Sequence, residues 1–398
     1  MKKLSYKHTL RASYIGYITQ AIVNNFAPLL FLTFRDSFGI PLEKITLLIT
    51  INFLTQLIID LLSTKLADKL GYRVCIITSH VSAGLGLIGL AVLPKILPDP
   101  FIGLLIAVIF YAIGGGFIEV LVSPMVEACP TDNKSAVMSL LHSFYCWGTV
   151  IVIFISTLFM YFFGKNSWPV LAVIWSILPL ANAVYFTAVP IATLTEDGNG
   201  MTLKELFTQK AFWLFIVLMF AAGASELAMS QWASAFTESG LGISKALGDL
   251  AGPCLFAVFM GAARVFYAKF SEKIDLMSFI IGSSVLCIIS YLLAALSPVP
   301  ALSLAGCAIC GLSVGIMWPG MYSIAAEKFP RGGTAMFAFM ALAGDTGCSG
   351  GPTAVGIISG LFGDNLKAGL LLAAVFPLIM LLFSIRYKAS KSKTKTQR

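Results

Sequence analysis

Long apolar runs alternate with short polar gaps along the whole chain. A membrane-spanning helix needs about 20 predominantly apolar residues. Twelve runs reach that length, so the sequence predicts an all-α membrane protein with twelve transmembrane helices. The predicted spans are residues 11–34, 44–67, 73–94, 101–127, 135–163, 168–190, 211–236, 246–270, 275–297, 300–326, 332–361 and 365–387.

The longest polar gap, residues 191–210, separates six predicted spans from the other six. Gly198-Asn199-Gly200 in this gap is a turn signal, and residues 201–209 can form a short amphipathic helix on the membrane surface. We therefore predict four parts: an N-terminal six-helix bundle over 1–190, a cytoplasmic linker over 191–210, a C-terminal six-helix bundle over 211–387 and a basic cytoplasmic tail over 388–398.

The two halves repeat weakly. Phe34-Arg35-Asp36-Ser37 ends the first span, and Phe236-Thr237-Glu238-Ser239 ends the seventh. Glu-x-x-Pro follows the fourth span at residues 127–130 and the tenth span at residues 327–330. These matches indicate two pseudo-symmetric six-helix units, and transporters built from repeats bind their cargo where the repeats meet.

Composition supports a membrane protein, because 58% of the residues are hydrophobic and only 12% are charged, against about 25% charged in soluble domains. Mean hydropathy is +0.88. The net charge of +8 is concentrated at the termini and in the gaps, which indicates membrane orientation and not a nucleic-acid partner. If the termini are inside, 21 of the 27 Lys and Arg residues, Arg264 among them, are also inside. We therefore expect both termini to be cytoplasmic.

Glu119 lies inside the fourth span, where a carboxylate is costly and marks a candidate functional site. Ser123 and Glu127 follow at helical spacing on the same face. Glu226 in the seventh span is a second such acid. We predict that Glu119 and Glu226 couple transport to protons, because a desolvated carboxylate binds a proton readily. A purely structural hydrogen-bonding role is the alternative for each.

Other polar and aromatic side chains within the spans are candidates for binding a solute. Amides inside a bilayer need partners, which are either the hydroxyls of a polar solute or neighbouring helices. Tryptophan rings can stack on a sugar, although they also favour membrane interfaces. The predicted substrate-binding residues are Gln20, Asn24, Asn25, Asn52, Gln56, His142, Tyr145, Gln231, Trp232, Trp318 and Asp345.

The gap after the second span, Thr64-Lys65-Leu66-Ala67-Asp68-Lys69-Leu70-Gly71-Tyr72-Arg73, resembles the signature of the major facilitator superfamily. Thr64 stands where that signature has its first glycine, and the remaining signature positions match. The resemblance implies the major facilitator fold and transport by rocking of two bundles. It also implies a cytoplasmic gate at Asp68, Lys69, Gly71 and Arg73. We add Asp60 to this predicted gate because it belongs to a polar stripe that leads from mid-membrane to the cytoplasmic gap, and a structural ion pair is the alternative for Asp60.

The segments FIEVLVSPMVE and SLLHSFYCWG resemble the fourth and fifth helices of the fucose permease branch, which contains proton-coupled importers of fucose, galactose and glucose. Glu119 matches the membrane glutamate of that branch, and Asn24-Asn25 matches its paired asparagines. Pro28 stands where the branch has another acid. Glu119 would therefore act alone or with Glu226.

Enzyme motifs are missing from the sequence. Gly114-Gly115-Gly116 is not followed by the Lys-Ser/Thr of a phosphate loop, and Cys307 and Cys310 are interpreted as packing residues. We predict a secondary transporter, without cofactor or metal, for a small sugar-like solute and protons. It would be a lipid-embedded monomer in the plasma membrane, or the inner membrane of a bacterium. The alternatives are a proton-driven drug or metabolite exporter on the same fold, and a non-transporting membrane sensor or scaffold.

Overall fold

The computed structural model describes residues 4–40, 42–192, 201–233, 236–237, 241–242, 250–363 and 365–396. Over these residues the chain is helical and contains no strand, which confirms the predicted all-α class. Within the described residues, nine helical segments are long and apolar enough to cross a membrane. Three further long helices, α1 (Tyr6–Leu29), α3 (Leu42–Leu70) and α16 (Gly333–Leu361), lie over the remaining predicted spans. The predicted turn at 198–200 lies outside the described residues.

Contacts divide the chain into two compact units. The first unit comprises Met1–Thr131, Phe144–Met201 and Arg331–Phe339, and the second comprises Asp132–Ser143, Thr202–Pro330 and Met340–Arg398. Two long helices, α6 (Lys134–Phe163) and α16 (Gly333–Leu361), contribute residues to both units.

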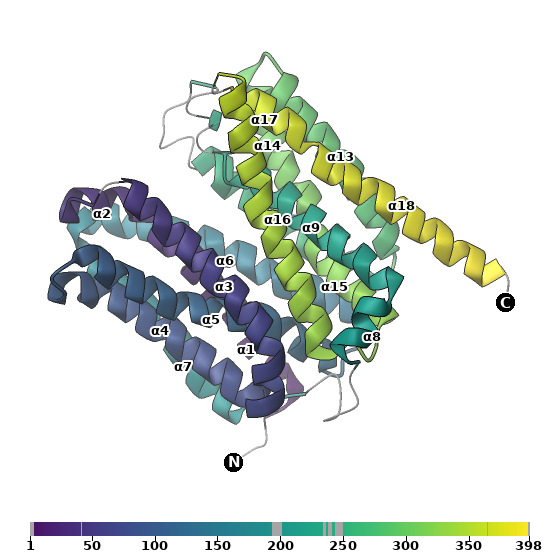
Figure 1. Ribbon diagram of the computed structural model, residues 1–398, viewed down its shortest axis with the longest axis horizontal. Helices are drawn as coiled ribbons and strands as arrows, with labels where there is room; N and C mark the ends of the chain where they lie inside the picture. Colours follow the sequence, from purple (N-terminus) through teal and green to yellow (C-terminus); the bar gives the residue numbers. More distant parts are fainter. Residues whose placement is uncertain are drawn as a thin grey trace. The chain divides into compact units, whose positions relative to one another are not determined.

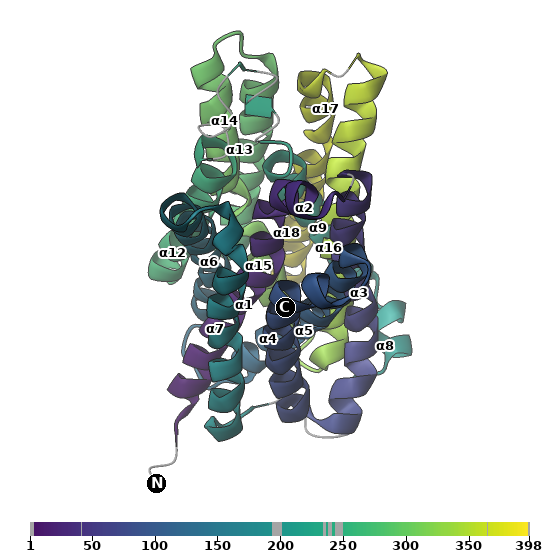
Figure 2. The same cartoon turned by 90° about the vertical axis from the view of Figure 1, so that its left-hand side faces the viewer.

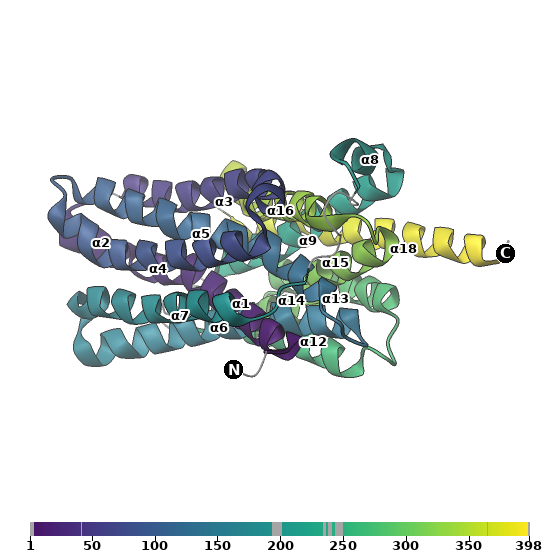
Figure 3. The same cartoon turned by 90° about the horizontal axis from the view of Figure 1, so that it is seen from below.

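The first unit contains helices drawn from purple through blue to teal in Figure 1. They are α1 (Tyr6–Leu29), α2 (Phe31–Phe38), α3 (Leu42–Leu70), α4 (Tyr72–Ile96), α5 (Pro100–Ala128), the 3-10 turn η1 (Lys165–Ser167) and α7 (Trp168–Ala188). Helix α4 packs along both α5 and α7 (Figure 3). A Cβ on Gly86 of α4 would lie 2.4 Å from the backbone nitrogen of Tyr111 on α5, so this close packing requires glycine.

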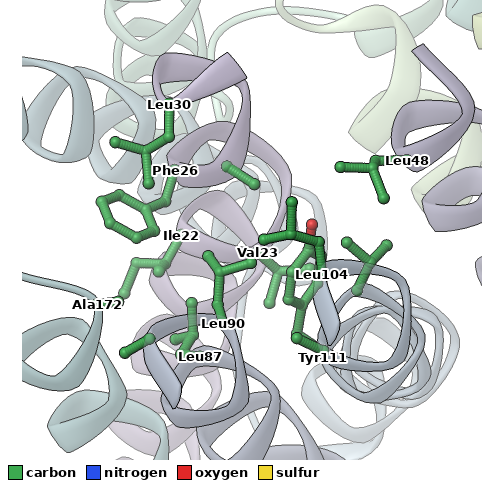
Figure 4. Packing of buried hydrophobic residues seen from close by; sticks show 14 of the residues in the cluster. Ile22, Val23, Phe26, Leu30, Leu48, Leu87, Leu90, Leu104, Tyr111 and Ala172 are labelled. Atoms are coloured by element: carbon green, nitrogen blue, oxygen red, sulfur yellow. The ribbon is translucent and has the colours of Figure 1, made fainter. Parts of the chain in front are cut away.

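Side chains from four helices fill the interior of the first unit. Ile22 and Phe26 of α1 meet Leu90 of α4, Leu104 of α5 and Ala172 of α7 (Figure 4). A polar contact joins three of these helices deeper in the unit. The side-chain nitrogen of Asn182 donates to the carbonyl of Ala12 at 3.0 Å and lies 2.9 Å from Nε2 of His80.

The second unit contains most of the remaining helices (Figure 2). They are α8 (Leu203–Thr208), α9 (Lys210–Ser230), the π-helical turn η3 (Leu250–Cys254), α12 (Leu255–Phe270), α13 (Leu276–Leu296), α14 (Pro300–Val314), α15 (Met317–Lys328), α17 (Leu366–Ala373) and α18 (Val375–Thr396). Helix α8 is the short helix predicted within the linker, and a capping box between Thr202 and Glu205 begins it.

Three predicted spans are each divided into two helices. The span at 11–34 is broken at Leu30, between α1 and α2. The span at 300–326 is broken between Val314 of α14 and Met317 of α15. The span at 365–387 is broken at Ala374, between α17 and α18. Hydropathy does not indicate such breaks, because the apolar run continues through them.

Candidate functional site

Five predicted site residues form one hydrogen-bonded chain in the first unit. Nε2 of Gln20 on α1 donates to Oε2 of Glu119 on α5 at 3.1 Å and to Oε1 of Gln56 on α3 at 3.0 Å. Nε2 of Gln56 in turn donates to Oδ1 of Asn24 at 3.0 Å. Nδ2 of Asn52 donates to the same Asn24 oxygen at 3.4 Å. We call Glu119, Gln20, Gln56, Asn24 and Asn52 the amide chain.

Local helix geometry explains how the amide chain forms. Gln20 and Asn24 are four residues apart on α1, as are Asn52 and Gln56 on α3, so each pair shares a helix face. Helix α5 approaches these faces through glycine. A Cβ on Gly115 would lie 3.1 Å from Oε1 of Gln20 and 3.3 Å from Cδ of Gln56.

Three members of the amide chain are buried, Asn24 and Glu119 are half-buried, and two acceptor atoms are left unused. Gln20 is 1% exposed, Gln56 4% and Asn52 6%. Oε1 of Gln20 and Oδ1 of Asn52 are buried and have no hydrogen-bond partner among the described residues. Leaving such a group unsatisfied costs about 1–3 kcal/mol. These two oxygens are therefore available acceptors, one at Gln20 next to the carboxylate and one at Asn52 at the other end of the amide chain.

Asn25 and Tyr145 lie outside the amide chain. Nδ2 of Asn25 donates to Oγ1 of Thr149 on α6 at 3.2 Å and to the carbonyl of Ala21 at 2.9 Å. The hydroxyl of Thr149 donates to the carbonyl of Tyr145 at 3.1 Å. Asn25 thus joins α1 to α6, as the helix–helix alternative anticipates.

Glu226 forms a buried ion pair in the second unit. Its Oε2 lies 3.6 Å from Nη2 of Arg264 on α12, and the two side chains are 13% and 3% exposed. Arg264 also donates from Nε to the carbonyl of Gly315 and from Nη1 to the carbonyl of His142, both at 2.7 Å. The pair therefore ties α9, α12, the break between α14 and α15, and α6 together within this unit.

Arg264 is a site residue that sequence reasoning missed, and counting it among the cytoplasmic charges is wrong. Helix α12 continues to Phe270, so Arg264 lies within the helix and is buried. The available signal was its position inside the apolar run FMGAARVFY, where an unpaired cation is as costly as an unpaired acid.

An aromatic group lies in the same unit as the ion pair. The ring of His142 is 5.8 Å from that of Tyr322, and the ring of Trp318 is 6.3 Å from that of Tyr322. Trp318 covers Gly344, next to the predicted site residue Asp345, and a Cβ on Gly344 would lie 2.2 Å from the ring. Nε1 of Trp318 is buried and has no hydrogen-bond partner among the described residues.

Gln231 and Trp232 are not brought into this group by any contact that we find. The side chain of Gln231 is exposed. The indole N–H of Trp232 donates to the carbonyl of Pro352 on α16 at 2.9 Å. Trp232 therefore already has a partner within the protein.

Four of the five predicted gate residues lie at the junction of α3 and α4, and the fifth, Asp60, lies within α3. Gly71 precedes this helix with φ of 81°, a conformation that favours glycine. The guanidinium of Arg73 donates to the carbonyls of Phe186, Thr187 and Val189 at 2.7–2.9 Å, which satisfies the end of α7. Lys69 is exposed and Asp60 is fully buried in α3. The side chain of Asp68 lies outside the described residues.

Comparison with solved structures shows which proteins share this fold. The fucose:proton symporter FucP of E. coli matches with a TM-score of 0.81 at 16% identity, covering 96% of this chain and 98% of that chain. The proton:xylose symporter XylE matches at 0.82 and 11% identity, covering 96% and 95%. The human organic anion transporter MFSD10 matches at 0.72 and 12%, covering 95% and 99%. No curated protein sequence matches the chain.

The sequence model of one family covers most of the chain. The model described as "Major Facilitator Superfamily" matches residues 13–352 and, in a second match, 255–398. This match and the shared fold confirm the twelve-helix, two-domain architecture that the sequence predicts. The chain therefore belongs to the Major Facilitator Superfamily and is a multi-pass membrane transporter, not an enzyme.

Proposed function

We propose that the protein is a secondary active transporter that moves a small polar solute, with a monosaccharide as the first candidate, together with protons by alternating access. The observation that carries this proposal is the amide chain, in which four amides and one carboxylate share hydrogen bonds between three helices. Amide groups suit hydroxyls because both donate and accept hydrogen bonds. A carboxylate beside them can change its charge within the same site.

Two further observations support proton coupling. Glu226 is a second acid inside the protein, with a side chain that is 13% exposed. When Glu226 is protonated, the positive charge of its partner Arg264 would remain within the second unit. Two of the structural neighbours are described as proton symporters of fucose and xylose. We further propose that Glu119 and Glu226 carry the coupled protons and that the amide chain binds the solute.

The proposed setting follows from the charge distribution. Without the buried Arg264, 20 of the 21 Lys and Arg residues counted on the side of the termini remain, and they favour a protein of the plasma membrane with cytoplasmic termini. We propose that it acts as a monomer among membrane lipids and that Asp60, Asp68, Lys69, Gly71 and Arg73 contribute to closure on the cytoplasmic side.

The test is uptake of a panel of labelled monosaccharides by proteoliposomes, with and without an inward proton gradient. We expect accumulation of at least one sugar only with the gradient, and its loss in Glu119→Gln. The Glu119→Gln protein should still exchange labelled for unlabelled sugar across the membrane, since exchange needs no net proton movement. Gradient-independent uptake would reject symport and leave facilitation, whereas dye or drug extrusion without sugar uptake would establish an exporter.

A further inference from the structure

The hydrogen bonds of the amide chain all have a direction that Glu119 determines. An ionised carboxylate can only accept, so Gln20 must turn its Nε2 towards Glu119. That nitrogen uses its other hydrogen on Oε1 of Gln56. Gln56 must then present Nε2 to Asn24, and the Asn24 oxygen also accepts from Asn52. One charge therefore fixes the orientation of four amides.

Protonation of Glu119 reverses this requirement, because a neutral carboxyl group carries an O–H donor. If Glu119 donates to Gln20, Gln20 must present Oε1. Gln56 must then present Nε2 to Gln20 and Oε1 to Asn24. Half-turns of all four amides preserve each of the four contacts, with donor and acceptor exchanged.

We propose that the amide chain reverses its hydrogen-bond direction when Glu119 takes up a proton, and so transmits the charge state of Glu119 from α5 through α1 to Asn52 on α3. This inference rests on the proposed function, since it links the proposed proton site to the proposed solute site.

The two ends of the amide chain permit the half-turns. Oε1 of Gln20 and Oδ1 of Asn52 have no hydrogen-bond partner among the described residues, so turning these amides breaks no bond at either oxygen. Gly115 leaves space beside Gln20 and Gln56, where a Cβ would lie 3.1 and 3.3 Å from them. A side chain at position 115 would crowd the NH₂ group that replaces the Gln20 oxygen after the turn.

The reversal changes what Asn52 offers to a solute. With Glu119 ionised, the unused atom of Asn52 is its oxygen, which is an acceptor. With Glu119 protonated, the unused atom becomes the amide nitrogen, which is a donor. A hydroxyl group can bind to either. A hydroxylated solute is therefore recognised at the position of this unused atom in both states, whereas a group that only accepts hydrogen bonds can bind at this position only in the protonated state.

Other titratable side chains will contribute to any pH profile of Glu119. Helices α1, α3 and α4 pack against α5. The buried titratable residues on these helices and on α5 are Tyr17, Asp60, Cys75, His80 and Tyr111, and His8, Tyr14, Tyr72 and Glu127 are half-buried. None of them is changed in the variants below, so comparison between variants removes their contribution.

The test measures proton uptake by Glu119 directly and needs no solute. Infrared difference spectra of the purified full-length protein would be recorded against pH. The carboxylic C=O band of Glu119 is identified by its loss in Glu119→Gln. Asn24→Asp introduces a carboxylate that only accepts hydrogen bonds, so it favours the direction that the amide chain has when Glu119 is ionised. The new negative charge also acts on Glu119 through space, and this effect is present whether or not the amide chain is intact. Gln56→Met breaks the chain, and with it the link to Asn24.

We compare the shift of the Glu119 midpoint that Asn24→Asp causes in the wild-type background with the shift that it causes in Gln56→Met. The shift in the wild-type background should lie about one pH unit further to the acid side. One pH unit corresponds to about the free energy of one hydrogen bond to a charged group. An equal shift in both backgrounds would overturn the proposal, as would a Glu119 band that does not titrate while the protein stays folded. An equal shift leaves the proposed function intact. A Glu119 band that does not titrate would also remove Glu119 from the proposed proton role, and the sugar uptake test separately decides whether the protein is a proton-coupled sugar transporter.

A second pair of variants covers the case in which Gln56→Met does not fold. Gly115→Ala should move the Glu119 midpoint to the acid side, because the added methyl group crowds the reversed amides. Gly89→Ala is the matched control, since its Cβ would meet only apolar atoms, at 3.2 Å from Leu93. Equal midpoints in Gly115→Ala and Gly89→Ala would contradict the reversal.

Discussion

Arg264 donates a 2.7 Å hydrogen bond from Nε to the carbonyl oxygen of Gly315, a carbonyl that the helix itself cannot satisfy. In a continuous α-helix this oxygen would accept from the N–H of residue 319. Residue 319 is proline and has no N–H. The break between α14 and α15 is therefore stabilised by a cation from α12, and that cation also faces Glu226.

The first prediction concerns loss of this cation. Arg264→Met leaves the Glu226 charge and the Gly315 carbonyl without Arg264 in a buried environment. Removing one partner of a buried ion pair costs about 3–5 kcal/mol. We expect a clear loss of thermal stability in detergent, and a smaller loss in the double variant Glu226→Gln/Arg264→Met.

Lys269→Met provides the control for that prediction, because Lys269 lies on the same helix and is exposed. It should unfold close to the wild-type temperature. If the double variant were less stable than Arg264→Met alone, the pairing of Glu226 with Arg264 would not be the source of the loss.

Much of the fold could be predicted from the sequence, because lipid requires each spanning helix to be apolar over its whole length. The spacing of Gln20 with Asn24, and of Asn52 with Gln56, also placed amides on shared faces. Which faces meet depends on packing between distant helices, so the link of Gln20 to Glu119 could not be predicted. Arg264 was missed because a cation near the end of an apolar run resembles an orientation signal.

The second prediction is a pH effect at Asp275, which precedes the membrane-spanning part of α13. Hydrogen bonds from the hydroxyl and the backbone N–H of Ser278, and the nearby Lys388, hold the pKa of Asp275 below its usual value of 3.8. Because the pKa is lowered in the folded state, the ionised carboxylate stabilises the start of the helix at pH values above the pKa that Asp275 has in the unfolded state. This stabilisation is lost as the pH falls through the folded value.

Hydrogen exchange of residues 276–279 checks this effect. Protection at the start of α13 should fall relative to the other helix ends as the pH drops below 3.8, the usual value for Asp. Asp275→Asn keeps a side chain that caps helices well but does not titrate. In that variant the same residues should show no such pH dependence, and persistence of the effect would assign it to another group.

The third prediction concerns the three carbonyls that Arg73 satisfies at the end of α7. Arg73→Met should lower stability by about 1–2 kcal/mol, since the arginine is exposed and water can replace part of its bonding. Hydrogen exchange should rise selectively in residues 186–190. Lys95→Met, an exposed cation at the other end of α4, is the control and should leave that segment protected. Unchanged exchange in Arg73→Met would show that these bonds do not hold α7.

The fourth prediction concerns the contact between Trp318 and Gly344. A methyl group at position 344 would lie 2.2 Å from Cη2 of Trp318, so the ring or α16 must move. Overpacking of this kind costs about 1–3 kcal/mol. We expect Gly344→Ala to unfold at a lower temperature, and Trp318→Phe to restore part of the loss because the smaller ring leaves the space open.

Gly350→Ala, whose Cβ would lie 3.7 Å from the Phe220 ring, tests an unstrained glycine of the same helix and should be close to wild type. Equal losses in Gly344→Ala and Gly350→Ala would mean that alanine on α16 is itself the cause, and not the Trp318 ring.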